Sequence, residues 1–192
     1  MIKLGVLGST KGTDLQVIFE AEKKTKLNAK VNVVISNKET AYILKRAENH
    51  GIPAVFINHK NKKREDFDSE ISAELKKNDI DLILLIGFMR ILSNEFCKAW
   101  QGKILNVHPS LLPKYSGGMD MNIHDEVIAN GDKESGCTIH FVTEELDNGP
   151  ILIQKKCKVI NGETAETLKT KVQQLEGLAF VEAINQLSKL PT

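Results

Sequence analysis

The segment MIKLGVLGSTKGTDLQVIFEAEKK, residues 1–24, decides the fold of this chain. Its apolar run Ile2–Leu7 has the length of a buried strand, and Gly8 opens a polar turn. Apolar residues then recur at helical spacing over Thr13–Lys24. A strand that passes through a glycine turn into a helix is typical of the first unit of a parallel sheet with crossover helices.

The same alternation continues along the chain. Strands are predicted at Ile2–Leu7, Val31–Ser36, Ala54–Phe56, Leu82–Ile86, Ile104–Val107, Thr138–Thr143 and Ile151–Lys156. Helices are predicted at Thr13–Lys24, Ala41–Asn49, Arg64–Lys77, Asn94–Ala99, Ile123–Ala129 and Ala165–Ser188. Because the last two strands leave no room for a crossover helix between them, we expect them to pair antiparallel or to continue around a loop.

These patterns predict a single α/β domain over residues 1–192. Its sheet is expected to be doubly wound and largely parallel, with an irregular, partly antiparallel C-terminal part. The front half, about residues 1–100, has the pattern of a phosphate- or nucleotide-binding unit. The back half, about residues 101–192, holds the reactive polar residues.

The charge balance of the chain is close to neutral. Among 192 residues, 26 are Lys or Arg and 25 are Asp or Glu, which gives a net charge of +1. This balance gives no reason to expect a nucleic-acid or membrane partner. We expect a globular protein that binds small-molecule substrates and is a monomer or weak homodimer.

Three cysteines, Cys97, Cys137 and Cys157, cannot all pair, and none lies in a C-x-x-C spacing. Reduced thiols are therefore expected, as is typical of a cytoplasmic protein. The five histidines are scattered without an H-x-x-x-H pair, so no metal site is expected. The N-terminal segment has the pattern of a strand and not of a secretory signal, and no apolar run reaches a membrane-spanning length.

The most distinctive polar residues are Asn106 and His108, followed about forty residues later by Asp147. An amide can donate a hydrogen bond to a developing oxyanion. An imidazole carries a proton near neutral pH, and a carboxylate orients it and stabilises its charged form. Neither a Ser nor a Cys lies in a context typical of a nucleophile, such as G-x-S-x-G. The set favours acyl transfer by direct attack of one substrate on the other, although each residue taken singly is also compatible with a structural role.

Two polar segments are expected at one edge of the sheet. His108 directly follows the strand predicted at Ile104–Val107, and Thr10 and Lys11 follow the first strand. Ligands of open α/β sheets bind at the carboxyl ends of the strands. The Gly8–Thr13 loop offers glycines and helix-terminal N–H groups that suit a phosphate, but a plain strand-to-helix turn explains it equally well.

Four motifs together resemble a known family. They are Gly8-Ser9-Thr10-Lys11-Gly12-Thr13-Asp14-Leu15, Gly87-Phe88-Met89-Arg90-Ile91-Leu92, Asn106-Val107-His108-Pro109-Ser110-Leu111-Leu112-Pro113 and Asp147-Asn148-Gly149-Pro150. Over essentially its whole length the chain closely resembles the phosphoribosylglycinamide formyltransferase (glycinamide ribonucleotide transformylase) family of folate-dependent formyltransferases. The resemblance implies a formyltransferase-like fold. It also implies transfer of a formyl group from the co-substrate 10-formyltetrahydrofolate to the amino group of 5-phosphoribosyl-glycinamide, in de novo purine biosynthesis.

The resemblance further implies roles for individual residues. Asn106 and His108 stabilise the oxyanion, while Asp147 keeps His108 protonated and takes part in proton movement through water. The residues expected to bind the phosphoribosyl acceptor are Thr10, Lys11, Gly12, Thr13, Asp14 and Glu176. The residues expected to bind the folate are Arg64, Met89, Arg90, Ile91, Leu92 and Val142.

The chain departs from the family pattern at several places, among them Thr10, where the family commonly has a Gly. Asp14 stands where an Asn is common, and its carboxylate either repels the phosphate or points away from it. Gly177 stands where a His usually follows the glutamate, and the Ser116–His124 segment is longer by about two residues. The resemblance also predicts a cis peptide bond at Leu112–Pro113, whereas His140 alternates along its strand and is expected to be structural.

Other functions are open from the sequence. A sugar-nucleotide formyltransferase or a formyltetrahydrofolate hydrolase shares the Asn, His and Asp set. A hydrolase is expected to carry an N-terminal regulatory domain, and a methionyl-tRNA formyltransferase a C-terminal RNA-binding domain; we expect neither here. The Gly8–Thr13 loop and Glu176 favour the phosphoribosyl acceptor. A non-catalytic nucleotide-sensing α/β module is least favoured, because all three core polar residues are present.

Overall fold

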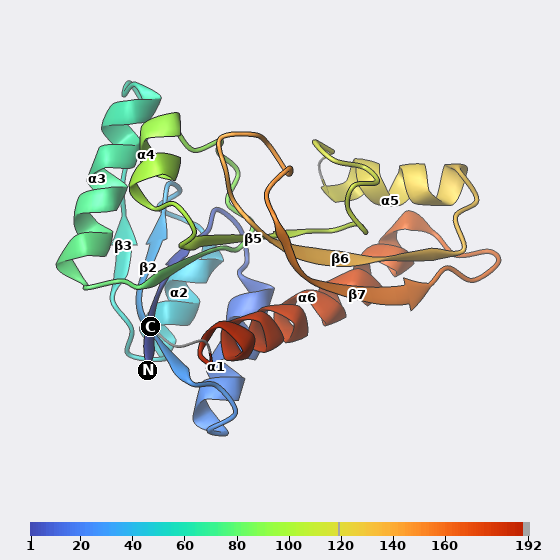
Figure 1. Cartoon of the computed structure of the whole chain (residues 1–192), viewed down its shortest axis with the longest axis horizontal. Coiled ribbons are helices and arrows are strands. Elements are labelled where there is room, and N and C mark those ends of the chain that lie inside the picture. The colour runs from blue at the N-terminus through green and yellow to red at the C-terminus, as the bar shows by residue number, and fades with distance from the viewer. Residues whose placement is uncertain (119, 190–192) are drawn as a thin grey trace.

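The structure is a computed structural model that describes residues 1–118 and 120–189. Seven strands form one sheet in the order β3-β2-β1-β4-β5-β6-β7 (Figure 1). The strands β1 to β5 pair in parallel, whereas β6 is antiparallel to both of its neighbours, β5 and β7. The predicted α/β fold, with a largely parallel sheet and an antiparallel C-terminal part, is confirmed. The strands are β1 (Ile2–Leu7), β2 (Ala29–Ser36), β3 (Ala54–Phe56), β4 (Leu82–Leu85), β5 (Ile104–His108), β6 (Glu134–Phe141) and β7 (Ile151–Lys158).

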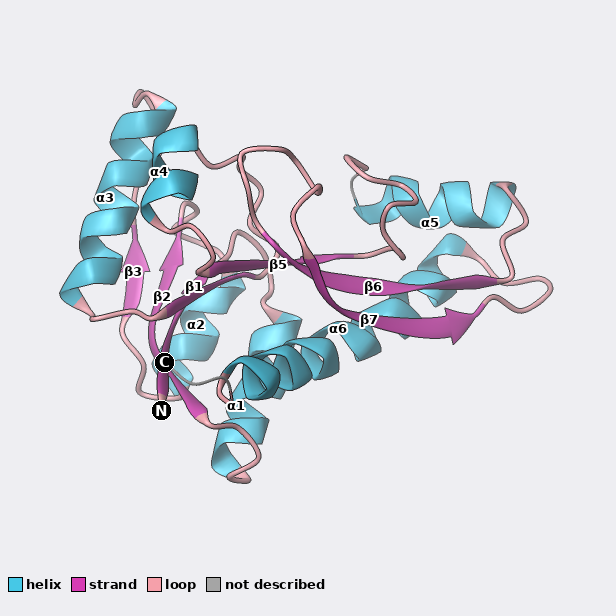
Figure 2. Ribbon diagram, in the orientation of Figure 1, coloured by secondary structure: helices cyan, strands magenta, loops and turns pink. Residues whose placement is uncertain are grey.

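Helices cover both faces of this sheet (Figure 2). They are α1 (Thr13–Lys23), α2 (Tyr42–Asn49), α3 (Arg64–Lys77), α4 (Asn94–Ala99), α5 (Asp120–Ala129) and α6 (Ala165–Leu187). One buried cluster, which includes Ile18 and Phe180, joins α1, α2, α5 and α6 to the sheet. A second, around Phe67 and Trp100, packs α3 and α4 against the sheet. No helix in the described part of the chain is long and apolar enough to cross a membrane.

Strand β6 differs most from its predicted bounds, because it covers Glu134–Phe141 instead of Thr138–Thr143. Gly136 is typical of a turn, yet it pairs with Lys156 of β7. A Cβ atom on Gly136 would lie 1.9 Å from the carbonyl oxygen of Lys155, so only glycine allows β7 to approach this closely. The partner strand therefore extends β6 into a segment whose own residues favour a turn.

The carboxyl ends of β1 and β4 meet at one edge of the sheet. The Ser9 N–H donates to the carbonyl oxygen of Gly87 (3.0 Å), and the Ser9 hydroxyl accepts from the N–H of Met89 (2.9 Å). Gly87 has a φ of 59°, and a Cβ atom there would lie 2.3 Å from Oγ1 of Thr10. The loops after β1 and β4 therefore pack directly on each other, and β5 lies beside β4. The shared rim that the sequence predicts is confirmed.

Candidate active site

Three polar side chains from two segments that are distant in sequence meet at the end of β5. Asn106 and His108 belong to β5, and Asp147 lies in the loop between β6 and β7. Nδ1 of His108 lies 3.3 Å from Oδ2 of Asp147, and the two side chains are only 4% and 7% exposed. Shielding from water strengthens the electrostatic interaction between them. The structure thus brings together the three residues that the sequence singles out.

The turn around Asp147 aims its carboxylate at His108. Asp147 has a φ of 52°, in the left-handed region that Asp tolerates better than most residues. At Gly149 a Cβ atom would lie 1.8 Å from the carbonyl oxygen of Phe141, so this turn requires glycine. The N–H of Gly117 donates to Oδ2 of Asp147 (2.9 Å). The carboxylate is therefore fixed from one side by its own turn and from the other by the loop after β5.

The second ring nitrogen of His108 is held by a backbone carbonyl. Nε2 lies 2.9 Å from the carbonyl oxygen of Tyr115. A carbonyl can only accept, so Nε2 carries a proton and donates it. Nδ1 is then the nitrogen that faces Asp147. When Nδ1 also takes a proton, both ring nitrogens have an acceptor, which suits a ring that alternates between neutral and charged forms during proton transfer.

His140 belongs to the same polar cluster, and its structural role stays a prediction. Asn106 and His140 face each other directly across β5 and β6. Nδ1 of His140 donates to the carbonyl oxygen of Phe141 (3.0 Å), which leaves Nε2 to accept from the Asn106 amide (3.2 Å). Burial lowers the pKa of His140 and keeps its ring neutral at pH 7. The register of β5 and β6 places the two side chains opposite each other. This contact therefore cannot be predicted from the sequence of either strand alone.

The loop after β5, residues 109–118, packs against this cluster. Its Leu112–Pro113 peptide bond is cis, as predicted. The Thr138 hydroxyl donates to the carbonyl oxygen of Ser110 (2.7 Å) and accepts from the N–H of Leu112 (3.1 Å). Strand β6 therefore holds the first half of the loop. Within the longer Ser116–His124 segment, Met119 lies outside the described residues.

The loop after β4 presents apolar side chains to solvent. Met89 is 44% and Ile91 62% exposed, whereas Leu92 is buried. The half-buried Val142 packs against the apolar cluster around Phe67. Large exposed apolar side chains on a rigid rim have the character of a surface that binds an apolar ring. Met89 and Ile91 therefore lie beyond the carboxyl end of β4, whereas the Val142 N–H bonds to the carbonyl oxygen of Ile104, at the amino end of β5 (2.9 Å).

The two arginines predicted to meet the folate tail lie around one carboxylate. Arg90 stacks on the ring of Phe67, with 4.9 Å between the guanidinium carbon and the ring centroid. Burial raises the pKa of Asp68, whereas hydrogen bonds from Ser93 and the charges of Arg90 and Arg64 oppose this rise. Asp68 therefore lies close to both arginines, which come from different elements. Two positive side chains placed together suit a ligand with more than one carboxylate.

The loop after β1 ends in a helix N-terminus without a side-chain cap. Gly12 occupies the cap position with a φ of 65°. Thr10, Lys11 and Thr13 are exposed, and the N–H groups of the first helical turn suit an anion. Asp14 is only 4% exposed. Of the two alternatives that the sequence leaves open, burial favours an Asp14 side chain that points away from such an anion.

Glu176 is buried with an exposed fraction of 9%, so it is not a solvent-facing helix glutamate. Burial and the charges of Glu176 and Asp14 raise the pKa of the Cys137 thiol. Both carboxyl groups therefore lie close to the same residue of β6. A Cβ atom on Gly177 would lie 2.6 Å from Cβ of Val17, so this glycine lets α6 pack closely on α1.

The remaining candidate ligands of the chain do not form a metal centre. Cys97, Cys137 and Cys157 are free thiols. Over residues 1–118 and 120–189, no group of three or more His, Cys, Asp or Glu side chains is arranged to hold a metal ion.

Residues 2–184 match the family model described as formyl transferase. The chain belongs to the formyl transferase family. Within this family, the phosphoribosylglycinamide formyltransferase of Escherichia coli strain K12 is 41% identical over 172 residues, which cover 89% of this chain and 80% of that protein. The trifunctional purine biosynthetic protein adenosine-3 of Gallus gallus is 44% identical over 184 residues. Those residues cover 95% of this chain but only 18% of that longer protein.

Solved structures agree with this family membership. The phosphoribosylglycinamide formyltransferase of Coxiella burnetii has a TM-score of 0.89 at 40% identity, and the match covers 95% of this chain and 85% of that one. A formyltetrahydrofolate deformylase of Pseudomonas syringae shares the fold, with a TM-score of 0.87 at 24% identity and with 95% and 60% of the two chains covered.

In this member of the formyl transferase family, replacing Asp14 with Asn is expected to stabilise the fold at neutral and alkaline pH. Burial raises the pKa of Asp14 from 3.8 to about 7. The folded protein therefore binds this proton more tightly than the unfolded chain, and its stability falls as the pH rises from about 4 to about 7. An Asn side chain does not titrate. The gain in the free energy of unfolding should therefore grow over this range and stay constant above it.

Urea denaturation of wild type and Asp14→Asn at about pH 5.5 and about pH 8 measures this difference. The exposed Glu20 of the same helix provides a matched control, and Glu20→Gln should leave the pH dependence of stability unchanged. If the stability difference between Asp14→Asn and wild type is the same at both pH values, Asp14 does not titrate between them.

Proposed function

We propose that this chain transfers a formyl group from 10-formyltetrahydrofolate to the amino group of 5-phosphoribosyl-glycinamide, a step of de novo purine biosynthesis. The observation that carries the proposal is the buried contact between His108 and Asp147 beside Asn106. Membership of the formyl transferase family and the similarity to phosphoribosylglycinamide formyltransferases support the choice of donor and acceptor.

In the proposed reaction the acceptor amine attacks the formyl carbon of the donor. A new C–N bond forms, and the bond from that carbon to N10 of the folate then breaks. Negative charge develops on the formyl oxygen between these steps. One N–H of the Asn106 amide bonds to His140, which leaves the second to donate to this oxygen. Protonated His108, whose Nδ1–H and Nε2–H bond to Asp147 and to the Tyr115 carbonyl, supplies a positive charge beside this oxygen. Preorganised charges and donors of this kind lower the barrier of acyl transfer.

The reaction also moves one proton. The attacking amine must lose a proton, and the departing folate nitrogen must gain one. Asp147 accepts the amine proton, directly or through a water molecule, and the same carboxylate stabilises the charged form of His108. The pair of His108 and Asp147 then returns a proton to the leaving nitrogen. No covalent enzyme intermediate is needed.

On the donor side, the apolar pterin ring is placed against Met89, Ile91 and Leu92, with Val142 beside them. Met89 and Ile91 lose exposed apolar surface when the ring binds, which favours binding. Arg64 and Arg90 are placed at the carboxylates of the folate tail. Because the Arg90 guanidinium already stacks on a ring, little side-chain freedom is lost when it pairs with a carboxylate.

On the acceptor side, the phosphate is placed at the N-terminus of α1. The backbone N–H groups of Gly12, Thr13 and Asp14 and the side chains of Thr10 and Lys11 surround this position. A helix N-terminus favours an anion through its free N–H groups and its dipole. Glu176, which lies near the first turn of α1, is placed at the sugar hydroxyl groups. This arrangement directs the amine of the acceptor toward the end of β5, because β1, β4 and β5 are adjacent.

A product assay with three acceptors tests the proposal. The protein is incubated with 10-formyltetrahydrofolate and either glycinamide ribonucleotide, an amino-sugar nucleotide or buffer alone, and tetrahydrofolate and formylated product are measured. Tetrahydrofolate and formylated product should form in equal amounts with glycinamide ribonucleotide and be near background otherwise. Formate release in buffer alone indicates a hydrolase, and formylation of the amino-sugar nucleotide indicates a sugar-nucleotide formyltransferase. Binding without turnover indicates a non-catalytic module.

A further inference from the structure

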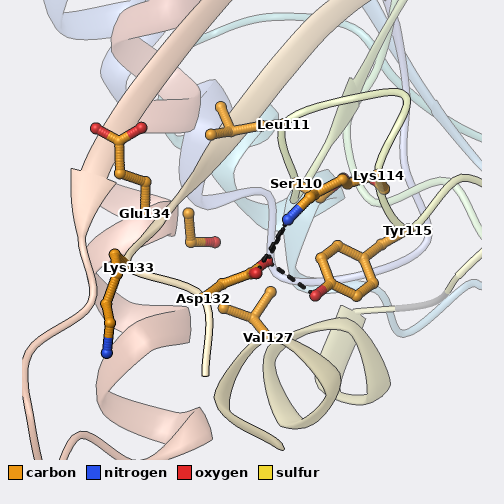
Figure 3. Close-up of a pocket in the computed structure, with 9 residues that line it drawn as sticks. Ser110, Leu111, Lys114, Tyr115, Val127, Asp132, Lys133 and Glu134 are labelled. Atoms are coloured by element: carbon orange, nitrogen blue, oxygen red, sulfur yellow. Dashed lines mark hydrogen bonds and ion pairs between the residues drawn. The ribbon is translucent and has the colours of Figure 1, made fainter. Parts of the chain in front are cut away.

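A second polar cluster lies behind the loop that follows β5. It lines a cavity of about 300 Å³ whose walls come from that loop, α5 and the start of β6, and which none of Asn106, His108 and Asp147 lines. In this cavity Lys114 and Tyr115 converge on Asp132 (Figure 3). The proposed reaction gives this cluster no role.

Asp132 holds the side chain of Tyr115 firmly. The Tyr115 hydroxyl donates to Oδ2 of Asp132 (2.9 Å) and accepts from the Asn130 amide (3.0 Å). Nζ of Lys114 lies 2.9 Å from Oδ1 and 3.0 Å from Oδ2 of the same carboxylate. The hydrogen bonds from Lys114 and Tyr115 lower the pKa of Asp132, so the carboxylate is charged at neutral pH. The bond from the Tyr115 hydroxyl is therefore charge-assisted.

The backbone of Tyr115 touches the active site directly. Its carbonyl oxygen accepts from Nε2 of His108 (2.9 Å) and from the N–H of Gly118 (3.2 Å). Tyr115 has a φ of 62°, a conformation that costs free energy in a residue with a bulky side chain and persists only when its surroundings hold it. Two residues later, the N–H of Gly117 bonds to Asp147. The segment around Tyr115 therefore positions both members of the catalytic pair.

The two halves of the loop have different anchors in the rest of the protein, and the Ser110 hydroxyl links them by donating to the carbonyl oxygen of Lys114 (2.6 Å). Thr138 and Gln154, from β6 and β7, bond to the backbone of Ser110 and Leu112 in the first half. Asp132, from the turn between α5 and β6, bonds to the side chains of the second half. Loss of the Asp132 carboxylate is thus expected to loosen Tyr115 without releasing the first half.

We propose that Asp132 is a positioning residue for formyl transfer, because through the Tyr115 phenol it holds the Tyr115 carbonyl against Nε2 of His108. The inference rests on the proposed function for its kinetic part. The fixed Nε2–H keeps Nδ1 directed at Asp147 and holds the charged ring in one orientation beside the reacting oxygen. When Tyr115 is loose, the His108 ring can exchange tautomers or rotate, so fewer bound complexes have a reactive geometry.

The hydrogen bond between Asp132 and Tyr115 should contribute more to positioning His108 than the ion pair between Asp132 and Lys114. The Lys114 side chain is 64% exposed, whereas Asp132 is 18% exposed. Exposed ion pairs contribute little because water and salt screen them and the long side chain loses freedom. We therefore expect Tyr115→Phe to lower turnover more than Lys114→Ala, although Phe keeps the packing of the ring.

The test compares Asp132→Ala, Asp132→Asn and Tyr115→Phe with wild type. Asp132→Ala and Tyr115→Phe should each lower kcat about tenfold, with the KM of both substrates changed less than about twofold. The double variant should be no worse than the worse single variant. Asp132→Asn keeps an acceptor for the phenol and should recover part of the loss. Glu182→Gln, which removes an exposed partner of Lys155 on α6, is the matched control and should keep the wild-type kcat.

Nitrogen-15 NMR of the histidine rings gives a readout that does not depend on turnover. In wild type, Nε2 of His108 should show the shift of a protonated, hydrogen-bonded nitrogen, and in Asp132→Ala and Tyr115→Phe this signal should move toward a mixture of tautomers. The inference is overturned if Asp132→Ala and Tyr115→Phe keep the wild-type kcat. It is also overturned if kcat falls in a variant while its His108 signal stays unchanged. Tyr115→Phe carries the test if Asp132→Ala does not fold. If the wild-type protein shows no formyl transfer, the proposed function is wrong. The NMR result still shows whether Asp132 and Tyr115 hold the hydrogen bond at Nε2 of His108.

Discussion

Replacing His108 or Asp147 with Ala is expected to lower kcat at least about 100-fold while the protein still folds. His108→Ala removes the positive charge that stabilises the oxyanion and the proton carrier. Asp147→Ala leaves His108 without the carboxylate that lies 3.3 Å from its Nδ1. Because the two side chains act as one unit, the double variant should be little worse than the worse single variant. Single-turnover measurements at saturating substrates, with circular dichroism as the folding check, test this expectation.

The matched control for Asp147→Ala is Asp79→Ala. Both aspartates have a φ of 52°, so both substitutions place Ala in the same unfavourable backbone conformation. Asp79 lies before β4, at the amino end of the strands and away from the reactive rim. Both variants should carry the cost of this backbone conformation in Ala, but only Asp147→Ala should lose activity. Near-wild-type turnover in either His108→Ala or Asp147→Ala would refute the catalytic assignment.

Asn106→Asp is expected to lower kcat about 10²–10³-fold at neutral pH, although the side chain keeps its shape. The carboxylate replaces a donor with a negative acceptor at the position of the developing oxyanion. It also faces Nε2 of His140, which accepts from the Asn106 amide in the wild type, and it adds a second negative charge near Asp147. Repulsion therefore acts on the transition state and on the resting cluster together.

Steady-state kinetics of Asn106→Asp at neutral pH measures this loss. Asn32→Asp makes the same chemical change on the half-buried face of β2 and should keep normal turnover. An unchanged rate in Asn106→Asp would mean that this amide does not face the reacting oxygen. A loss that appears only as a raised KM would place Asn106 in substrate binding and not in catalysis.

Most helices and strands of the fold can be predicted from local patterns of apolar and polar residues. Apolar runs such as Ile2–Leu7 and helical periodicity such as that of Arg64–Lys77 predicted the elements, most of them within three residues of the observed bounds. Strand β6 is the exception. Its first half includes Gly136, a residue typical of turns, which pairs with Lys156 of β7. Pairing with a strand that is distant in sequence can override the local propensity of a segment. Such pairing cannot be predicted from that propensity.

Local sequence patterns were enough to predict the strand–helix alternation, the rim that the loops after β1 and β5 share, and the candidates Asn106, His108 and Asp147. These follow from periodicity and residue chemistry, which are local properties. Three features became visible in the folded protein alone. They are the contact of His140 with Asn106, the burial of the Asp14 side chain and the hydrogen bond from the Tyr115 hydroxyl to Asp132. Each of these depends on strand register, burial or a left-handed loop residue. Those quantities arise from packing between segments that are far apart in the chain, so no short stretch of sequence contains them.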